Sequence, residues 1–339
     1  MPGFRTFSTV SVIALSLSPL GACAATSGPP PARLERAGAP APATSSLATR
    51  GSETLSIPDL GPCAHDRSRG ITVDPARPLT ILVPGCHSSP EQMAPLAREL
   101  EAQGQQTLCF SYDDREKLER SARRLVTALE TLTPHLVSRY ITVLGHSQGG
   151  LIARRALVRD RPRALRDDGT FRYELVTVSS PFHGIESSAH CGSILLHVVT
   201  MGVTVGVCHL IAGAKWAQIF PRSSFMRRPG SLLPSVERHL KIVTDERDSC
   251  RTRDGTGRCL HRDYVFSLGE QYSEATDDDA RAHTLEIKAG HSEIVGEAGG
   301  PPVKLMHLLE EQQVLVPSGR ARRPAGPAFA GTNISTNMY

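Results

Sequence analysis

Apolar runs alternate along this chain with amphipathic stretches. Each run is four to six residues long and rich in Val, Ile and Leu, which is typical of strands buried on both faces. The runs cover residues 79–83, 107–112, 140–144, 174–178, 239–243 and 284–287. The stretches between them predict helices over 91–103, from Asp113 to about Leu129, and over 303–312. This alternation predicts an α/β fold with a mostly parallel central sheet and helices on both faces.

One stretch, between the strands at 174–178 and 239–243, breaks the alternation. Residues 194–214 contain no Asp, Glu, Lys or Arg. We expect an apolar lid or cap over about 185–232, inserted at the carboxyl-terminal edge of the sheet; a pair of core helices is the alternative. An apolar cap would suit an acyl chain or a lipid surface.

The amino-terminal segment has the features of an export signal. Arg5 is its only early charge, and the apolar run at 10–17 is too short for a permanent membrane span. The sequence Leu-Gly-Ala-Cys ending at Cys23 resembles the lipobox of bacterial lipoproteins. That resemblance implies a signal peptide over residues 1–22 and a lipidated Cys23 that anchors the protein to a membrane. The alternative is an ordinary secretory signal, cleaved between Ala22 and Ala25, with Cys23 incidental.

Residues 23–52 are rich in Pro, Ala, Ser and Gly, which predicts a disordered linker, and residues 316–339 have a similar character. One globular domain is therefore expected over residues 53–315. The residue after Cys23 is Ala24 and not an acidic residue, which by resemblance favours the outer membrane of the cell envelope. A secreted protein is the alternative.

The charge pattern gives no sign of a nucleic-acid partner. The formal net charge is +4 over 339 residues, and no basic stripe is interleaved with aromatic residues. No obligate protein partner is evident either.

Seven cysteines follow Cys23, and an exported protein can form disulfides. We predict a Cys250–Cys259 pair across a polar loop and, second to it, a Cys191–Cys208 pair. A pair between Cys63 and Cys86 is a weaker expectation, and Cys109 is expected to be a buried thiol. An odd count leaves at least one thiol unpaired. Because no C-x-x-C spacing occurs, we expect no structural metal.

The strongest chemical signal is the pentapeptide Gly-His-Ser-Gln-Gly at 145–149. It lies between an apolar strand and a helical stretch, so Ser147 is expected on a tight strand-to-helix turn with its hydroxyl exposed. The helix start offers N–H groups to a developing negative charge. Ser147 is therefore a candidate nucleophile; an ordinary serine in a glycine-rich turn is the alternative.

A serine nucleophile needs a histidine base and a carboxylate that orients it, in the order Ser, acid, His. His291 follows the last strand and is the predicted base, whereas His283 precedes that strand and His307 lies on the final helix. The predicted acid is Asp248, with Asp245 as the second candidate. Either aspartate could instead simply pair with a neighbouring arginine, Arg247 or Arg251.

The oxyanion hole requires two N–H donors. We expect one from Gln148, directly after the nucleophile, and one from the backbone of Cys86 in the loop after the first central strand. Gly85 lets that loop turn, and His87 either lines the site or lies on the surface.

Three stretches carry a wider resemblance, at 82–85, 145–150 and 180–184. Over about 75–313 the chain resembles serine hydrolases of the α/β-hydrolase fold, in the style of secreted bacterial lipases and esterases. It departs from them at Pro84, where many members have His, and in the longer loop around Cys250 and Cys259.

This resemblance implies attack by Ser147 on an acyl ester, a lipid-like one in particular, through an acyl-enzyme and without a metal or organic cofactor. Two alternatives stay open. One is another acyl-transfer enzyme with the same triad, such as a thioesterase, an amidase or an acyltransferase. The other is a catalytically inactive binding protein of the envelope.

Overall fold

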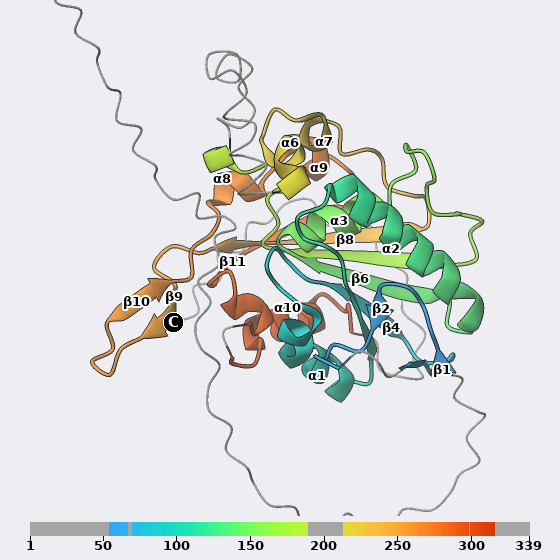
Figure 1. The fold of residues 1–339 in the computed structure, drawn as a ribbon, viewed down its shortest axis with the longest axis horizontal. Coiled ribbons are helices and arrows are strands. Elements are labelled where there is room, and N and C mark those ends of the chain that lie inside the picture. The colour runs from blue at the N-terminus through green and yellow to red at the C-terminus, as the bar shows by residue number, and fades with distance from the viewer. Residues whose placement is uncertain (1–53, 67–69, 189–212, 298, 316–339) are drawn as a thin grey trace, which may run out of the picture.

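The fold is known from a computed structural model, which describes residues 54–66, 70–188, 213–297 and 299–315 (Figure 1). The predicted signal peptide, Cys23, the linker and the tail lie outside the described residues. So do most of the apolar stretch at 194–214 and both cysteines of the predicted Cys191–Cys208 pair.

A seven-stranded sheet forms the centre of the molecule. Its strand order is β11-β8-β7-β6-β4-β5-β2, and every neighbouring pair is parallel except β5 with β2. The strands are β2 (Leu60–Gly61), β4 (Leu79–Val83), β5 (Gln106–Phe110), β6 (Tyr140–His146), β7 (Arg172–Val178), β8 (Val236–Asp245) and β11 (Ala282–Lys288). All six predicted strands are present, and the predicted mostly parallel α/β architecture is confirmed.

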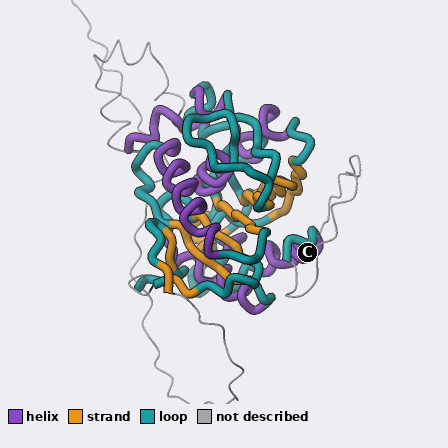
Figure 2. Tube along the Cα trace, turned by 90° about the vertical axis from the view of Figure 1, so that its right-hand side faces the viewer, coloured by secondary structure: helices purple, strands orange, loops and turns teal. Residues whose placement is uncertain are grey.

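Helices cover both faces of this sheet (Figure 1 and Figure 2). On one side lie α1 (Ala94–Ala102), which follows the short η1 (Pro90–Met93), and α10 (Val303–Glu311); on the other lie α2 (Leu118–Leu132) and α3 (Gln148–Ala156). The sheet divides the core in two because alternate strand residues point to opposite faces. Ile81 and Val143 pack with α2 and α3, whereas Leu82 and Leu144 pack with α1 and α10.

Short helices gather above α3 in Figure 1, in the region expected to hold the cap. They are η4 (Gly213–Lys215), α6 (Trp216–Ile219), α7 (Ser224–Arg227), α8 (Leu268–Gln271) and α9 (Glu274–Asp277). The guanidinium of Arg154 on α3 donates to the carbonyls of Pro229 and Gly230 and so ties the segment after α7 to the sheet layer. Within the described ranges, no helix is both long and apolar enough to cross a membrane.

The remaining described elements are small. Antiparallel pairs are formed by β1 (Thr54–Leu55) with β3 (Ile71–Thr72) and by β9 (Cys250–Arg253) with β10 (Cys259–Arg262). The single turns are η2 (Thr133–His135) and η5 (Glu293–Val295).

Two disulfides join described residues. The predicted Cys250–Cys259 bond is present and closes the β9–β10 hairpin. The expectations for Cys63 and Cys109 were wrong, because these two cysteines bond to each other. The antiparallel pairing of β2 with β5 sets Gly61 opposite Cys109 and so brings Cys63 close to it. Cys86 is also disulfide-bonded, although not to Cys63.

Candidate active site

The candidate active site lies where five neighbouring parallel strands end. Strand register aligns Val83 with Gly145, His146 with Val178, and Asp245 with Lys288. The loops that follow these strands therefore meet at one edge of the sheet, the usual place for ligands in open α/β sheets. They carry Gly85 and Cys86 after β4, Ser147 after β6, Ser179 after β7, Glu246 after β8 and His291 after β11.

Ser147 occupies the predicted tight turn between β6 and α3. Its backbone has φ 54° and ψ −126°, a conformation that non-glycine residues rarely adopt and that surrounding contacts must hold. The Ser147 N–H donates to the carbonyl of Val178 at 2.8 Å. A Cβ on Gly149 would lie 2.1 Å from the carbonyl oxygen of Val83, and a Cβ on Gly145 would collide with the backbone of Gly149. Both glycines are therefore required by close backbone approach, as the sequence pattern predicts.

His291 is held by the carboxylate of Glu246. Its Nδ1 lies 2.8 Å from Glu246 Oε1, and both side chains are buried. An ionised carboxylate only accepts hydrogen bonds, so Nδ1 carries the proton and Nε2 is left with a free lone pair. His291 is therefore in the tautomer that a general base requires.

Glu246 is surrounded by donors. The Ser179 hydroxyl donates to Oε1 at 2.6 Å and lies 2.8 Å from His291 Nδ1. The backbone N–H groups of Val265 and Phe266 donate to Oε2 at 2.5 and 2.9 Å. Burial alone would raise the pKa of Glu246, but the hydrogen bonds from His291, Ser179 and Val265 lower it below its ordinary value. The carboxylate therefore stays ionised beside the imidazole.

This arrangement corrects the predicted position of the acid. Asp248 is exposed, with φ 65°, and makes no contact with His291 in the described part of the chain. The Asp245 carboxylate binds Arg247 in two places, at 2.8 and 2.7 Å, which is the alternative considered for it from the sequence. The reason is that β8 continues to Asp245, two residues beyond the predicted end, so Glu246 is the first residue of the loop.

The turn that carries His291 is fixed by Asp263. The His291 N–H donates to the backbone carbonyl of Asp263. The N–H groups of Ser292 and Glu293 donate to Oδ2 of the Asp263 side chain at 3.0 and 2.9 Å. Arg251 from β9 binds its Oδ1 at 3.0 Å. A Cβ on Gly290 would lie 2.3 Å from Asp263 Oδ2, so only glycine allows this approach.

His146, next to Ser147 in the sequence, also contacts the turn that carries His291. Its Nε2 donates to the carbonyl of His291 at 2.9 Å, and the two rings lie 4.7 Å apart between centroids. The carboxylate of Glu297 lies 3.6 Å from its Nδ1. His146 thus links the turn at Ser147 with the turn at His291.

The expected oxyanion loop lies against the nucleophile. A Cβ on Gly85 would be 2.9 Å from Ser147 Cβ and 3.4 Å from Ser147 Oγ. The Tyr112 hydroxyl donates to the carbonyls of Pro84 and Gly85, which holds this loop in place. Gln148 begins α3, where backbone N–H groups have no partner within the helix. These positions agree with the predicted roles of Cys86 and Gln148, which stay predictions.

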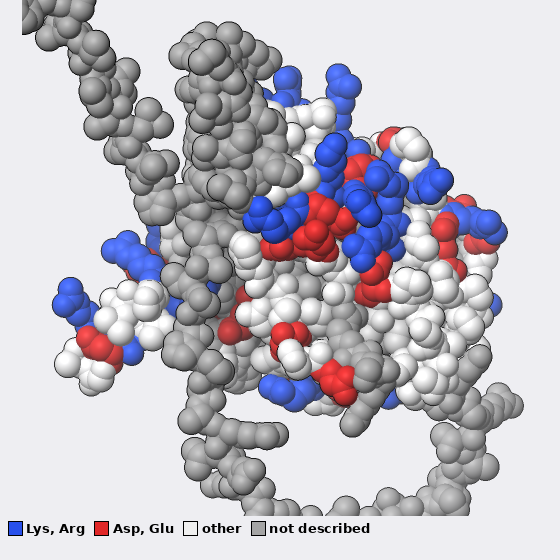
Figure 3. Space-filling model, viewed as in Figure 1, with Lys and Arg blue, Asp and Glu red and all other residues white. Residues whose placement is uncertain are grey.

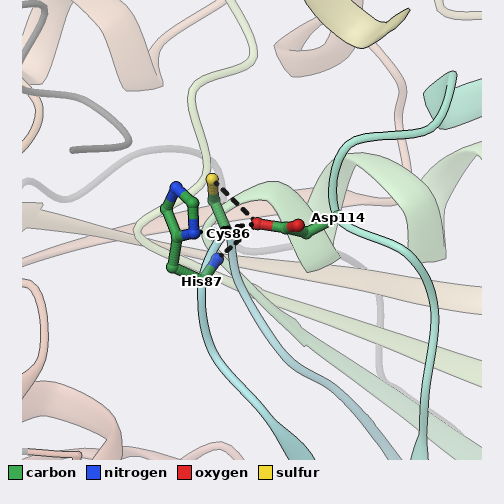
Figure 4. Close-up of side chains that lie close together, drawn as sticks. All are labelled: Cys86, His87 and Asp114. Carbon is green, nitrogen blue, oxygen red and sulfur yellow. Dashed lines mark hydrogen bonds and ion pairs between the residues drawn. The ribbon is translucent and has the colours of Figure 1, made fainter. Parts of the chain in front are cut away.

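Beside this loop, Cys86, His87 and Asp114 bring three potential metal-ligand atoms together (Figure 4). The Cys86 sulfur belongs to a disulfide, so it is no thiolate and a poor metal ligand. The Asp114 carboxylate instead accepts from the His87 N–H at 2.9 Å, and Lys215 Nζ lies 3.0 Å from Cys86 Sγ. The cluster is better explained as support for the loop than as a metal centre.

Three residues of the site were missed from the sequence: Glu246, Ser179 and Asp263. Only Glu246 left a signal, since it stands in the acidic segment after β8. Ser179 and Asp263 contact His291 although they lie 112 and 28 residues before it in the sequence, and no local sequence pattern links either of them to the histidine.

Comparison with solved structures finds bacterial and archaeal esterases and lipases. The mature lipase BlEst2 of Bacillus licheniformis is 13% identical, with 75% of this chain and 96% of that chain covered and a TM-score of 0.42. Esterase B of Lactobacillus rhamnosus is 12% identical (78% and 87% covered, TM-score 0.45), and an esterase of Pyrococcus furiosus is 15% identical (70% and 82% covered, TM-score 0.41).

No curated protein sequence matches the chain significantly. One family model does match, over residues 75–208, which include the loop after β4, Ser147 and Ser179. Over that segment the chain is similar to the family described as "Putative serine esterase (DUF676)".

Proposed function

We propose that this protein is a serine carboxylester hydrolase that acts through an acyl-enzyme. The observation that carries the proposal is the 2.8 Å contact between His291 Nδ1 and the Glu246 carboxylate, which favours the proton on Nδ1 and leaves Nε2 as a base at the sheet edge where Ser147 lies. The match of residues 75–208 to a serine esterase family supports the same reaction class.

In this mechanism His291 Nε2 removes the proton of Ser147 Oγ as the oxygen attacks the ester carbonyl. The N–H groups of Gln148 and Cys86 stabilise the negative charge that develops on the carbonyl oxygen. The imidazolium then gives its proton to the departing alkoxide, and the acyl group stays on Ser147. Water, deprotonated by His291, attacks the acyl-enzyme; the bond to Ser147 Oγ breaks, His291 returns the proton to that oxygen, and the carboxylic acid is released.

The proposed substrates are acyl esters with an apolar chain. The charge-free segment at 194–214 supports this choice, as do the apolar side chains of Leu151, Phe182, Phe225 and Met226 in a pocket that Arg154 and Arg155 also line. Leu151, one helical turn after Ser147 on α3, lines this pocket, whereas Ser147 and His291 do not. We further propose that the lipobox-like sequence anchors the enzyme in the cell envelope through Cys23.

The experiment is the hydrolysis of p-nitrophenyl esters from acetyl to palmitoyl by the wild-type protein and by Ser147→Ala. We expect activity in the wild type, a loss of about 10⁴-fold or more in the variant, and an optimum at medium or long chains. The control is Ser138→Ala, in the loop before β6 and so at the opposite end of that strand from Ser147. Equal activity of wild type and Ser147→Ala would refute the proposal.

A further inference from the structure

The β9–β10 hairpin stands apart from the body of the molecule. It extends to the left of the sheet in Figure 1, beyond the edge where β8 and β11 end. A two-stranded hairpin is only marginally stable in water, and here the Cys250–Cys259 bond joins the strands. A covalently closed element that projects from the fold is suited to contact a surface outside the protein.

The hairpin carries a dense positive charge. Four of the thirteen residues from 250 to 262 are arginine, and Asp254 is the one acidic residue among them. Arg253, Arg258 and Arg262 are exposed, and none forms an ion pair with another described residue. In Figure 3 the part of the molecule that projects to the left, where Figure 1 shows the hairpin, carries blue side chains around a small red area.

Asp254 does little to neutralise this charge. Its Oδ1 accepts from the N–H and hydroxyl of Thr256 and from the N–H of Arg258, so it serves to close the turn. A large apolar side chain also lies on the hairpin, since Leu260 is 56% exposed. An exposed leucine between arginines is typical of elements that lie at a membrane interface, where cations meet phosphates and the apolar group enters the acyl boundary.

The base of the hairpin is joined to the candidate active site. The Asp263 N–H donates to the Ser249 carbonyl, which closes the base. Arg251 on β9 and the turn of His291 both bind Asp263. A surface bound by the hairpin would therefore lie next to the edge of the sheet that carries His291.

We propose that the β9–β10 hairpin docks the protein on an anionic lipid surface, with Arg253, Arg258 and Arg262 on the phosphates and Leu260 inserted below them. The proposal goes beyond ester hydrolysis and does not depend on it. It would bring the catalytic edge to face lipid, whether or not a lipid anchor is attached to Cys23.

The test measures vesicle binding by the full chain with Cys23→Ser, which removes the lipidation site. Sedimentation with vesicles of phosphatidylglycerol and phosphatidylcholine in equal parts is compared with phosphatidylcholine alone. Each basic residue at an anionic surface contributes a factor of about five, so Arg253→Gln/Arg258→Gln/Arg262→Gln should weaken binding to the anionic vesicles by about 100-fold. Binding should also fall steeply with added salt.

The matched control is Arg98→Gln/Arg123→Gln/Arg166→Gln, which removes the same charge from exposed positions elsewhere. It should bind the anionic vesicles nearly as well as the parent. Leu260→Ser should weaken binding several-fold while leaving the charge intact. Activity on a soluble short-chain ester should be unchanged in every variant, so failure of the proposed hydrolase would be seen separately.

Equal binding of the two triple variants would overturn the proposal, as would a parent that does not distinguish anionic from neutral vesicles. A hairpin that binds a soluble polyanion such as heparin as tightly as the vesicles, with no effect of Leu260→Ser, would also overturn it, because the partner would then be recognised by charge alone.

Discussion

At the scale of single residues, the position of Glu246 explains how a buried carboxylate remains charged. Transfer of an isolated carboxylate out of water costs about 5 kcal/mol or more unless hydrogen-bond donors replace the lost solvent. Here Ser179, His291 and Thr244 surround Oε1, and two backbone N–H groups bind Oε2. In the proposed mechanism this charge stabilises the imidazolium that forms when His291 accepts a proton.

Substitution of this carboxylate is the first prediction. Glu246→Gln removes the negative charge and permits the wrong tautomer of His291, so kcat/KM should fall by about 10³-fold or more. Asp248→Asn and Asp245→Asn serve as controls and should stay within about twofold of wild type, since neither carboxylate contacts His291. Ester hydrolysis by the three variants decides the point; a larger loss in Asp248→Asn than in Glu246→Gln would show that the acid is misassigned.

A second prediction concerns Lys215, whose side chain is buried beside the Cys86 sulfur. Burial lowers its pKa to about 8, although Asp114 and Asp113 oppose this shift and Arg115 adds to it. The ordinary value is 10.5, so between these two pH values the unfolded chain binds more protons than the folded protein. The free energy of unfolding should therefore rise with pH from about 8 to about 10.5.

Lys215→Met should raise the free energy of unfolding at pH 7 by about 1–3 kcal/mol, because it removes a charge that is costly to bury. It should also abolish the rise above pH 8. Urea unfolding at pH 7 and pH 10 measures both effects, with the exposed Lys304→Met as control. A variant that is less stable than wild type at pH 7 would contradict the prediction.

The sequence predicts where Ser147 and His291 lie but not which carboxylate contacts the histidine. Each of the first two follows an apolar strand within a glycine-containing turn, and that local pattern fixes its place. The acid depends on where β8 ends and on N–H groups of Val265 and Phe266, 19 and 20 residues further on. Such long-range donors leave no trace in the local sequence.

At the scale of elements, the hairpin and the final turn act as one support for His291. Asp263 follows β10 and binds two N–H groups of the turn after His291 as well as Arg251 on β9. Asp263 touches no reacting atom in the proposed mechanism, so it is a positioning residue.

The third prediction is that Asp263→Asn lowers kcat by about tenfold and leaves KM nearly unchanged, because the base is misplaced while the substrate pocket is intact. Asp254→Asn at the tip of the same hairpin should have no effect on either constant. Steady-state kinetics, with thermal unfolding to confirm that both variants fold, tests this. An equal effect of the two substitutions would argue that the hairpin acts only through overall stability.

Elements with a strong apolar pattern were predictable, and polar ones were not. Five of the six parallel strands are largely buried, so their sequences are apolar over much of their length, whereas β11, at the edge of the sheet, is half-exposed and alternates apolar with polar residues. The strands of the β9–β10 hairpin are mostly exposed and contain arginine, threonine and histidine, so no apolar periodicity marks them. The helix expected after Asp113 begins at Leu118 instead, since the residues between form a turn that contacts the loop after β4 through Asp114.

At the scale of the whole molecule, the Cys63–Cys109 bond attaches the amino-terminal part of the domain to the central sheet. It joins residues 46 positions apart, across the edge pair β2 and β5. The pairing was not predictable from spacing, because it depends on which strand lies at the edge of the sheet.

Removal of this bond is the fourth prediction. Cys63→Ala/Cys109→Ala should lower the free energy of unfolding by about 4 kcal/mol, through the greater entropy of the unfolded chain. The Cys250–Cys259 bond closes a loop with a separation of only 9. Its removal in Cys250→Ala/Cys259→Ala should therefore lower the free energy of unfolding by about 3 kcal/mol or less. Urea denaturation of both variants gives the comparison, and a smaller loss for the Cys63–Cys109 bond would contradict it.

The most direct test of the central claim is the site of covalent labelling by a fluorophosphonate, located by mass spectrometry of the digested protein. Ser147 and Ser179 both stand at the ends of neighbouring strands with positive φ, and Ser179 lies within hydrogen-bonding distance of His291. We expect a stoichiometric adduct on Ser147 that is lost in His291→Ala and retained in Ser138→Ala. An adduct on Ser179, or no adduct in the wild-type protein, would contradict the assignment of Ser147 as the nucleophile of a serine hydrolase.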